Sequence, residues 1–307
     1  MVSTQKPIFA VVGATGFQGK SVVAEAYKTG KYHIRALTRN PKSEGAQKLL
    51  AEFPEIELVE SNNNDGKSLV AAFSGATYAF LFTNFWDAAE KLDPLTDLRQ
   101  GKLQADAAKE AGVKFVIWSS LPDVEGISKG TIDVPFFSNK AKVDKYLESI
   151  GQDHAVIYAG WYASNWDRWG IGPTRQKDGS LSVELPFRAD VALPVLDTEA
   201  DFGKFVVAIL ENPKAFAGKH IIAASEYQTY PQIAADYARV TGEPVKVVQV
   251  PLDSVSSKEV REMYRWFNKF GNSNGELLDN DTIFGRAKPK LNNFGGWLER
   301  TGFRVPK

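Results

Sequence analysis

Three glycines near the N-terminus limit most strongly what this chain can fold into. Gly13, Gly16 and Gly19 follow an apolar run at residues 8–12, which reads as a buried strand, and residues 17–27 have the apolar spacing of a helix. Glycine permits a tight turn and a close approach of the backbone to a ligand, and the N–H groups of a helix's first turn attract an anion. The stretch therefore predicts a phosphate-binding turn, although its G-x-x-G-x-x-G spacing meets the usual G-x-G-x-x-G fingerprint only in part. An ordinary turn between strand and helix is the alternative.

The end of the next predicted strand, residues 32–37, indicates which dinucleotide such a turn would hold. In dinucleotide-binding folds this strand end meets the adenine ribose, about 20 residues after the glycine turn, and a carboxylate there accepts from the ribose 2′-OH. This chain instead has Arg39, with Lys42 nearby and no acid until Glu44. A guanidinium can hold a phosphate with two parallel hydrogen bonds. We therefore expect NADP(H) rather than NAD(H), with a solvent-exposed loop arginine as the alternative.

The pattern of one strand followed by one helix repeats along the first half of the chain. Five such units closed by a sixth strand are typical of a parallel sheet covered by helices on both faces. We therefore predict an α/β fold, a Rossmann-type doubly wound parallel sheet. The expected strands are residues 8–12, 32–37, 56–59, 78–82, 114–118 and 154–158, and the expected helices are residues 17–27, 45–53, 67–73, 95–111 and 139–149.

The regular alternation of strand and helix ends after Tyr158. No Gly/Ser/Pro-rich stretch separates the two halves of the chain. We therefore predict that residues 1–158 form the NADP-binding domain and that residues 159–307 form a smaller, mixed α/β C-terminal lobe for a substrate or partner, without a linker between them. In this lobe, strands are expected at residues 181–185, 191–193, 220–223 and 245–250, and helices at residues 199–210, 230–241, 258–270 and 291–301.

Two further strand ends carry side chains that could contact a dinucleotide, because ligands of doubly wound sheets lie at the carboxyl ends of the strands. Asn62 and Asn63 follow the third strand, where their amides could bond to the adenine edge, but they serve equally well as turn formers. Residues 83–86, Thr-Asn-Phe-Trp, end the fourth strand. Their aromatic rings could flank a nicotinamide or a substrate, with packing within the loop as the alternative.

This chain lacks one of the residues that catalysis of the short-chain dehydrogenase type requires, the tyrosine. That chemistry uses a tyrosine as proton donor, and a lysine four residues later lowers the pKa of its hydroxyl. Phe136 stands four residues before Lys140, so the tyrosine is absent, and Ser119 after the fifth strand has no acid beside it. Lys140 keeps a possible catalytic role, because its ammonium can reach a nicotinamide ribose or a carbonyl oxygen. A surface lysine on an amphipathic helix is the alternative.

Composition argues against several other functions. The chain has no cysteine, which excludes disulfides, thiolate catalysis and thiolate metal sites. Its three histidines each begin a predicted strand, so we expect them to be structural and expect no metal. Lys and Arg together number 37, as do Asp and Glu, so nothing favours nucleic acid or an anionic membrane as a partner. We see no signal peptide and no apolar run that could cross a bilayer, so we expect a cytoplasmic protein, with the nucleus as a second compartment.

Short segments spread over most of the chain carry a family resemblance. They are GATGFQG (13–19), TRNPK (38–42), FTNFW (82–86), QGK (100–102), SNKAKVDKYL (138–147), YASNW (162–166), and the C-terminal PKL (289–291) and GWL (296–298). Together they resemble the NmrA-like family, atypical relatives of the short-chain dehydrogenases/reductases, and most of all its NADP(H) redox-sensor branch. The resemblance implies a Rossmann domain that prefers NADP(H), commonly without the catalytic tyrosine. It also implies a sensor whose conformation or partner binding follows the NADP(H) state; the fungal founding member is a nitrogen-repression regulator that binds a GATA factor.

Carried across by position, the resemblance implies contacts to every part of the cofactor. The pyrophosphate would be held by Gly13, Thr15, Gly16, Phe17, Gln18 and Gly19. The 2′-phosphate and the adenine would be met by Arg39, Lys42 and Asn62, the last at a position where many members have Asp. The nicotinamide half would be surrounded by Thr83, Asn84, Phe85, Lys140, Tyr162 and Asn165.

The region beside the expected nicotinamide is more aromatic than a sensor needs. Trp161, Trp166 and Trp169 stand close together in the sequence. We expect the first two, with Trp86 and Ser119, to line a substrate pocket; packing in the core of the smaller lobe is the alternative.

Two functions therefore stay open. The first is a redox sensor or regulator that lacks the Tyr-Lys catalytic pair and has a regulatory protein as its possible partner. The second is an NADPH-dependent reductase of a hydrophobic or aromatic small molecule, using Lys140 and Tyr162. Isoflavone-reductase-like relatives rely on such a lysine without the tyrosine pair. A homodimer is compatible with either function.

Overall fold

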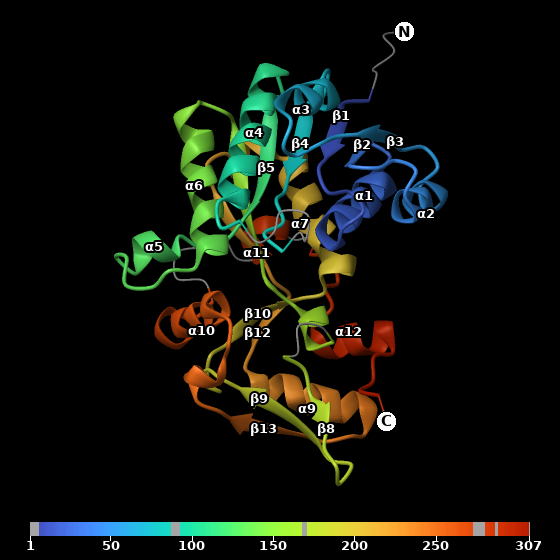
Figure 1. The fold of residues 1–307 in the computed structure, drawn as a ribbon. Coiled ribbons are helices and arrows are strands. Elements are labelled where there is room, and N and C mark those ends of the chain that lie inside the picture. Colours follow the sequence, from blue (N-terminus) through green and yellow to red (C-terminus); the bar gives the residue numbers. More distant parts are fainter. Residues whose placement is uncertain (1–5, 87–92, 168–170, 273–279, 286–287, 307) are drawn as a thin grey trace.

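The computed structural model describes residues 6–86, 93–167, 171–272, 280–285 and 288–306. This part of the chain forms a larger upper part around one sheet and a smaller lower part (Figure 1). Trp169, the third tryptophan of the aromatic region noted in the sequence, lies outside the described residues. No helix within these ranges is long and apolar enough to cross a membrane.

Within the described ranges, seven parallel strands form the large sheet, in the order β11-β6-β5-β4-β1-β2-β3. β1 lies between β2 and β4, so the sheet is extended in opposite directions on its two sides, and ligands of doubly wound sheets bind at this switch point. The predicted Rossmann-type fold class is confirmed. The strands are β1 (Ile8–Val11), β2 (His33–Thr38), β3 (Glu57–Glu60), β4 (Tyr78–Leu81), β5 (Phe115–Ser120), β6 (His154–Ala159) and β11 (His220–Ala223).

Helices cover both faces of this sheet, as its apolar strands require. On one face α1, α2 and α7 pack through a core that includes Val22 and Phe202. On the other face α3, α4 and α6 pack through a core that includes Leu69 and Val143. The helices are α1 (Phe17–Thr29), α2 (Glu44–Glu52), α3 (Gly66–Phe73), α4 (Thr96–Glu110), α6 (Pro135–Ser149) and α7 (Thr198–Glu211), with shorter helices α5 (Val124–Ile127), α8 (Pro213–Phe216) and α11 (Asn280–Phe284).

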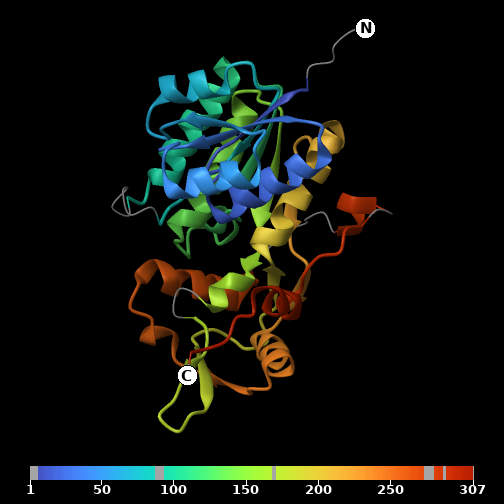
Figure 2. The same cartoon turned by 90° about the vertical axis from the view of Figure 1, so that its right-hand side faces the viewer.

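The second half of the chain also contributes to the larger part. β11 pairs in parallel with β6, with Ile221 opposite Ile157, and α7 (yellow) lies against α1 (blue) in Figure 2. Gly203 of α7 permits this close approach, because a Cβ there would lie 2.1 Å from the carbonyl oxygen of Ser21. Both segments were expected in the smaller lobe, since periodicity identifies a strand or helix but not its neighbours. The division at residue 158 stays a prediction, and the large sheet draws on both sides of it.

Two small sheets, β12-β10-β7 and β13-β9-β8, build the smaller part, which is mixed α/β as predicted. Its core is rich in aromatic rings: the ring centroid of Trp166 lies 5.7 Å from that of Tyr230 and 5.3 Å from that of Phe294. The elements are β7 (Trp161–Tyr162), β8 (Thr174–Arg175), β9 (Leu181–Leu185), β10 (Leu193–Leu196), β12 (Glu226–Gln228), β13 (Val245–Gln249), α9 (Tyr230–Thr241), α10 (Lys258–Phe270), α12 (Phe294–Thr301) and the 3-10 turns η2 (Ala163–Trp166) and η3 (Leu252–Ser254).

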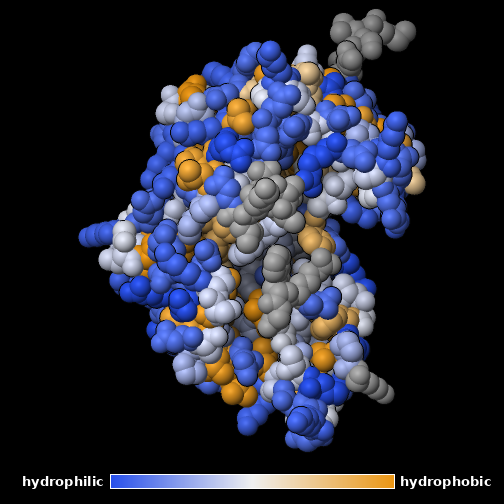
Figure 3. Space-filling model, viewed as in Figure 1, coloured by the Kyte–Doolittle hydropathy of each residue, from blue (hydrophilic) through white to orange (hydrophobic). Residues whose placement is uncertain are grey.

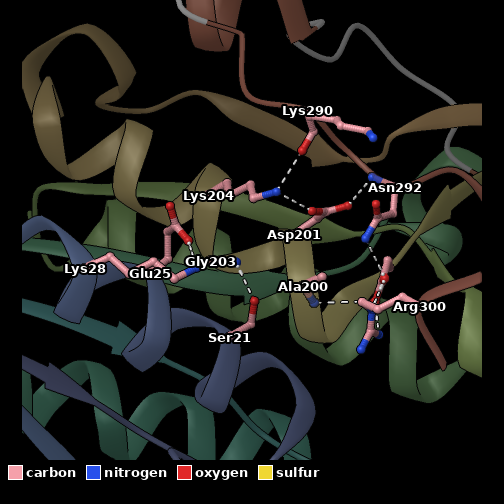
Figure 4. A network of polar contacts seen from close by, with 11 residues as sticks. Ser21, Glu25, Lys28, Ala200, Asp201, Gly203, Lys204, Lys290, Asn292 and Arg300 are labelled. Carbon is pink, nitrogen blue, oxygen red and sulfur yellow. Dashed lines mark hydrogen bonds and ion pairs between the residues drawn. The ribbon is translucent and has the colours of Figure 1, made fainter. Parts of the chain in front are cut away.

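The C-terminal strap, residues 288–293, ties the smaller part to α7 (Figure 4). The backbone N–H of Asn292 donates to Asp201 Oδ2 at 2.6 Å. Next to the strap, Arg300 of α12 donates to both carboxylate oxygens of Asp197, each at 2.7 Å. Asp197 and Asp201 are buried, so these contacts compensate two carboxylates that would be costly without partners.

Candidate functional site

The glycine turn between β1 and α1 has the geometry that the sequence predicts. Gly13 has a φ of 67°, in the left-handed region that favours glycine. A Cβ added to Gly19 would lie 2.1 Å from the carbonyl oxygen of Gly13, so this close approach of helix and turn needs glycine at position 19. Gly16 caps α1 without a side chain, and the first turn of the helix holds no acidic residue. The positive end of α1 is therefore not neutralised by a carboxylate of its own first turn, as an anion site requires.

A chain of polar side chains crosses from the large sheet to the smaller part through Gln18. Ser119 Oγ, near the end of β5, donates to Gln18 Oε1 at 2.6 Å, and Gln18 Nε2 donates to Tyr162 Oη at 2.5 Å. Burial raises the pKa of Tyr162 to about 12, against a smaller lowering by the Gln18 donor, so the hydroxyl is protonated at neutral pH. The structure thus joins three residues that the sequence assigned separately to substrate, pyrophosphate and nicotinamide.

Lys140 is buried instead of lying on a helix surface. Only 8% of the residue is exposed, and its Nζ lies 2.8 Å from Thr83 O, 2.6 Å from Thr83 Oγ1 and 3.1 Å from Asp97 Oδ1. The alternative of a surface lysine is therefore wrong. Asp97 was missed by sequence reasoning, because an acid in the first turn of a helix is usual at the surface and no local pattern marks this one as buried.

An aromatic cluster, Phe85, Trp86 and Phe136, lies beside the end of β4. The ring centroid of Phe136 lies 5.3 Å from that of Phe85 and 5.4 Å from that of Trp86. Phe136 stands where the catalytic tyrosine of short-chain dehydrogenases would be, and only 6% of it is exposed. Asn84 is exposed, and its Oδ1 accepts from the N–H of Trp86 at 3.2 Å. The sequence predicted that Phe85 and Trp86 lie near a ligand. It could not predict their contact with Phe136, because that residue lies about 50 positions further along the chain.

The residues expected at the adenine end lie on the exposed edge after β2 and β3. Arg39 and Lys42 are both exposed, and the N–H of Lys42 donates to Asn40 Oδ1 at 2.9 Å. Asn62 is exposed too, but its Oδ1 accepts from the N–H of Asn64 at 2.9 Å, which is the local turn bond of its alternative reading. The structure therefore leaves the two basic side chains at the predicted place and gives Asn62 a turn role.

Trp161 and Trp166, two of the three tryptophans of the predicted pocket, belong to the core of the smaller part. Trp166 is 2% exposed and Trp161 is 8% exposed, and both pack against Tyr230. This is the packing alternative that the sequence left open. Asn165 lies beside Trp166 in η2 and is half-buried. Within the described ranges, no group of His, Cys, Asp and Glu side chains could hold a metal ion.

The carboxyl ends of the large sheet's strands face the smaller part, because β6 runs directly into β7. The surface is hollowed between the two parts on the face shown in Figure 3. The glycine turn, the end of β4 and Tyr162 therefore lie at the side of the large sheet that faces the smaller part.

Comparison with known proteins agrees with this geometry. The model of the NmrA-like family matches residues 5–298. The chain is 32% identical over 265 residues to the NmrA-like family domain-containing oxidoreductase notA of Aspergillus sp. (strain MF297-2), a match that covers 81% of this chain and 78% of that protein. It is 30% identical over 249 residues to the NmrA-like family domain-containing oxidoreductase FrzB of Cladobotryum sp, covering 76% of this chain and 74% of that protein.

Solved structures of other proteins share this fold. NmrA, a negative transcriptional regulator, in complex with NADP is similar with a TM-score of 0.75 and 26% identity, over 98% of this chain and 93% of that one. The NADPH-dependent quinone oxidoreductase QOR2 of Escherichia coli, complexed with NADPH, shares the fold with a TM-score of 0.72 and 22% identity, over 96% of this chain and 100% of that one. This chain belongs to the NmrA-like family.

Proposed function

We propose that this protein binds NADP(H) and acts as a redox sensor or regulator, without dehydrogenase chemistry of the Tyr-Lys type. The observation that carries the proposal is an intact glycine turn combined with the absence of the Tyr-Lys pair. Phe136 replaces the tyrosine, and the ammonium of Lys140 is enclosed by Thr83 and Asp97. The similarity to NmrA in complex with NADP supports the same function.

The residues present fit a dinucleotide that carries a 2′-phosphate. The turn at residues 13–19 would receive the pyrophosphate on backbone N–H groups, and glycine at position 19 permits the close approach of helix and turn that forms it. Arg39 and Lys42, exposed after β2, would hold the 2′-phosphate. Asn84 and Tyr162 would lie toward the nicotinamide, which when bound could give or accept a hydride.

The contact between Gln18 and Tyr162 would connect cofactor binding to the smaller part. Gln18 belongs to the first turn of α1, and Tyr162 belongs to β7 of the smaller part. A sensor needs the two redox forms to bind with different affinity to two conformations, because only differential affinity shifts an equilibrium. We propose that a regulatory protein in the cytoplasm or nucleus binds the smaller part in one of those conformations.

A second candidate function is an NADPH-dependent reductase of an aromatic or otherwise hydrophobic small molecule. The cluster of Phe85, Trp86 and Phe136 beside the end of β4 favours it, because rings at this edge can stack on a planar ligand. Relatives such as notA and FrzB are described as oxidoreductases, which also favours it. In this function Lys140 would have to leave Thr83 before it could act on a ligand.

Titration with NADPH, NADP, NADH and NAD, followed by tryptophan fluorescence, tests the first proposal. We expect the phosphorylated pair to bind at least about tenfold more tightly, since one charge-assisted contact contributes about 1.5–3 kcal/mol. A difference between NADPH and NADP would support sensing, and equal affinities would contradict it. Steady NADPH consumption with a panel of quinones and aromatic carbonyls would instead support the reductase.

A further inference from the structure

The ammonium of Lys140 makes two hydrogen bonds, both to Thr83, and one ion pair with a buried carboxylate. It donates to Thr83 O at 2.8 Å and to Thr83 Oγ1 at 2.6 Å, and it pairs with Asp97 Oδ1 at 3.1 Å. An ammonium has three donors and no acceptor, so Thr83 occupies two of them, while the ion pair holds the charge beside the buried carboxylate of Asp97. The rings of Phe82 and Trp118 lie 5.3 Å and 5.5 Å from Nζ and close its sides.

Asp97 holds Lys140 at this position. The residue is 0% exposed, and neither carboxylate oxygen accepts a hydrogen bond from a described residue. Within the described chain, the ion pair with Lys140 at 3.1 Å therefore compensates the buried negative charge. Removing one partner of a buried ion pair leaves an uncompensated charge, which is strongly destabilising. Movement of Lys140 toward a ligand would leave Asp97 in that state, so the lysine is fixed where it is.

What Lys140 fixes is the carboxyl end of β4. Thr83 lies two residues after Leu81, the last residue of this strand, and leads into the exposed Asn84. One residue earlier, the side-chain amide of Gln104 accepts from Phe82 N at 3.1 Å and donates to Phe82 O at 3.0 Å. Two helices, α4 and α6, therefore hold the end of the strand that borders the switch point beside β1.

We propose that Lys140 and Asp97 are positioning residues that preorganise the end of β4 for the nicotinamide half of the dinucleotide. The inference rests on the proposed NADP(H) site and changes the role of Lys140 from direct contact to support. It assigns Asp97 a function that its place in the sequence does not indicate. The adenine half binds at the ends of β2 and β3 in this proposal, so it does not depend on these two residues.

Because the adenine and nicotinamide halves of the dinucleotide bind at different strand ends, the positioning role of Lys140 can be tested on each half separately. Binding of NADPH and of adenosine 2′,5′-bisphosphate, which carries only the adenine half, is measured by calorimetry for the wild type and Lys140→Met. We expect the variant to bind NADPH at least about fivefold more weakly and the bisphosphate within about twofold of wild type, because only the nicotinamide half loses its preorganised contact. Lys142→Met is the matched control: Lys142 lies on the same helix, half-exposed and paired with Glu125 at 2.6 Å, and its loss should change neither affinity.

The double variant Asp97→Asn/Lys140→Met distinguishes support from direct contact. It removes the buried charge together with the lysine, so NADPH affinity should recover in part relative to Lys140→Met alone. A direct ligand contact would give no recovery, and that result would overturn the inference. Equal losses for NADPH and the bisphosphate in Lys140→Met, or no loss for either, would overturn it as well.

A further variant covers the case in which Lys140→Met does not fold. Asp97→Asn keeps the lysine and removes its charged partner, so it should weaken NADPH selectively and by a smaller factor; unchanged NADPH affinity would refute the inference. If the wild type itself bound neither NADPH nor the bisphosphate, the proposed cofactor site would fail, which is a separate outcome from failure of the positioning role.

Discussion

Gly19→Ala is the substitution whose effect the structure defines most closely. The added Cβ would lie 2.1 Å from the carbonyl oxygen of Gly13 and 2.6 Å from its carbonyl carbon, and both are backbone atoms that no rotamer change can move. The turn would have to open by about 1 Å, and such overpacking costs about 1–3 kcal/mol. With an unfolding entropy of about 2.1 cal/mol/K per residue, a loss of about 2 kcal/mol lowers the Tm of a chain of this length by about 3 °C.

The same displacement should remove cofactor binding, because hydrogen bonds to phosphate tolerate only about 0.5 Å of variation in length. Thermal unfolding with and without NADPH measures both effects, since a ligand that binds only the folded state raises Tm. We expect the wild type to gain Tm with NADPH and Gly19→Ala to start lower and gain nothing.

Gly45→Ala is the control for this experiment. Gly45 also lies in the first turn of a helix, but its nearest atom to an added Cβ is Thr15 Cβ at 3.9 Å, so the change should be neutral or slightly stabilising. A Gly19→Ala protein with wild-type Tm and a wild-type response to NADPH would refute the reasoning about the turn.

Two other predictions concern the ends of the site. Arg39→Ala should weaken NADP binding roughly 10- to 100-fold through loss of a charge-assisted contact of about 1.5–3 kcal/mol, while NAD binding stays almost unchanged; equal losses for both would mean that Arg39 does not contact the 2′-phosphate. Burial raises the pKa of Tyr162 to about 12, from about 10 in the unfolded chain, so the folded state keeps a proton that the unfolded state releases between these values. The free energy of unfolding should therefore be unaffected by this group below about pH 10 and fall as the pH rises toward 12. In urea unfolding at stepped pH, Tyr162→Phe should show a smaller fall than wild type. The remainder comes from other tyrosines whose pKa is raised by burial, among them Tyr32 and Tyr264, both to about 12, and Tyr158 and Tyr230. Identical falls would contradict the burial of the Tyr162 hydroxyl.

The sequence predicts well what depends on neighbouring residues. The glycine turn is a local device, so spacing alone located it, and the repeating strands and helices gave the fold class because each element shows its own periodicity. The place of Arg39 followed from the same logic, since it directly follows β2.

What the sequence could not predict depends on contacts between distant segments. For Lys140 the sequence suggested contact with a ligand, with a surface position as the alternative, and could not show its burial, because its partner Asp97 lies on another helix. The tryptophans looked suited to a pocket until the folded chain surrounded Trp166 with Tyr230, Tyr237 and Phe294.

The sharing of the large sheet between both halves of the chain has a consequence for biosynthesis. When β6 has emerged from the ribosome, its outer edge still has no neighbour, because β11 is encoded after four strands of the smaller part, β7 to β10. At roughly 5–20 residues per second, the stretch from Ala159 to Ala223 takes several seconds to translate. During that time the nascent chain presents an open strand edge and an α1 that α7 has not yet covered, both of which favour aggregation. The growing chain therefore passes through an interval in which it depends most on chaperones, and this interval ends when α7 and β11 dock.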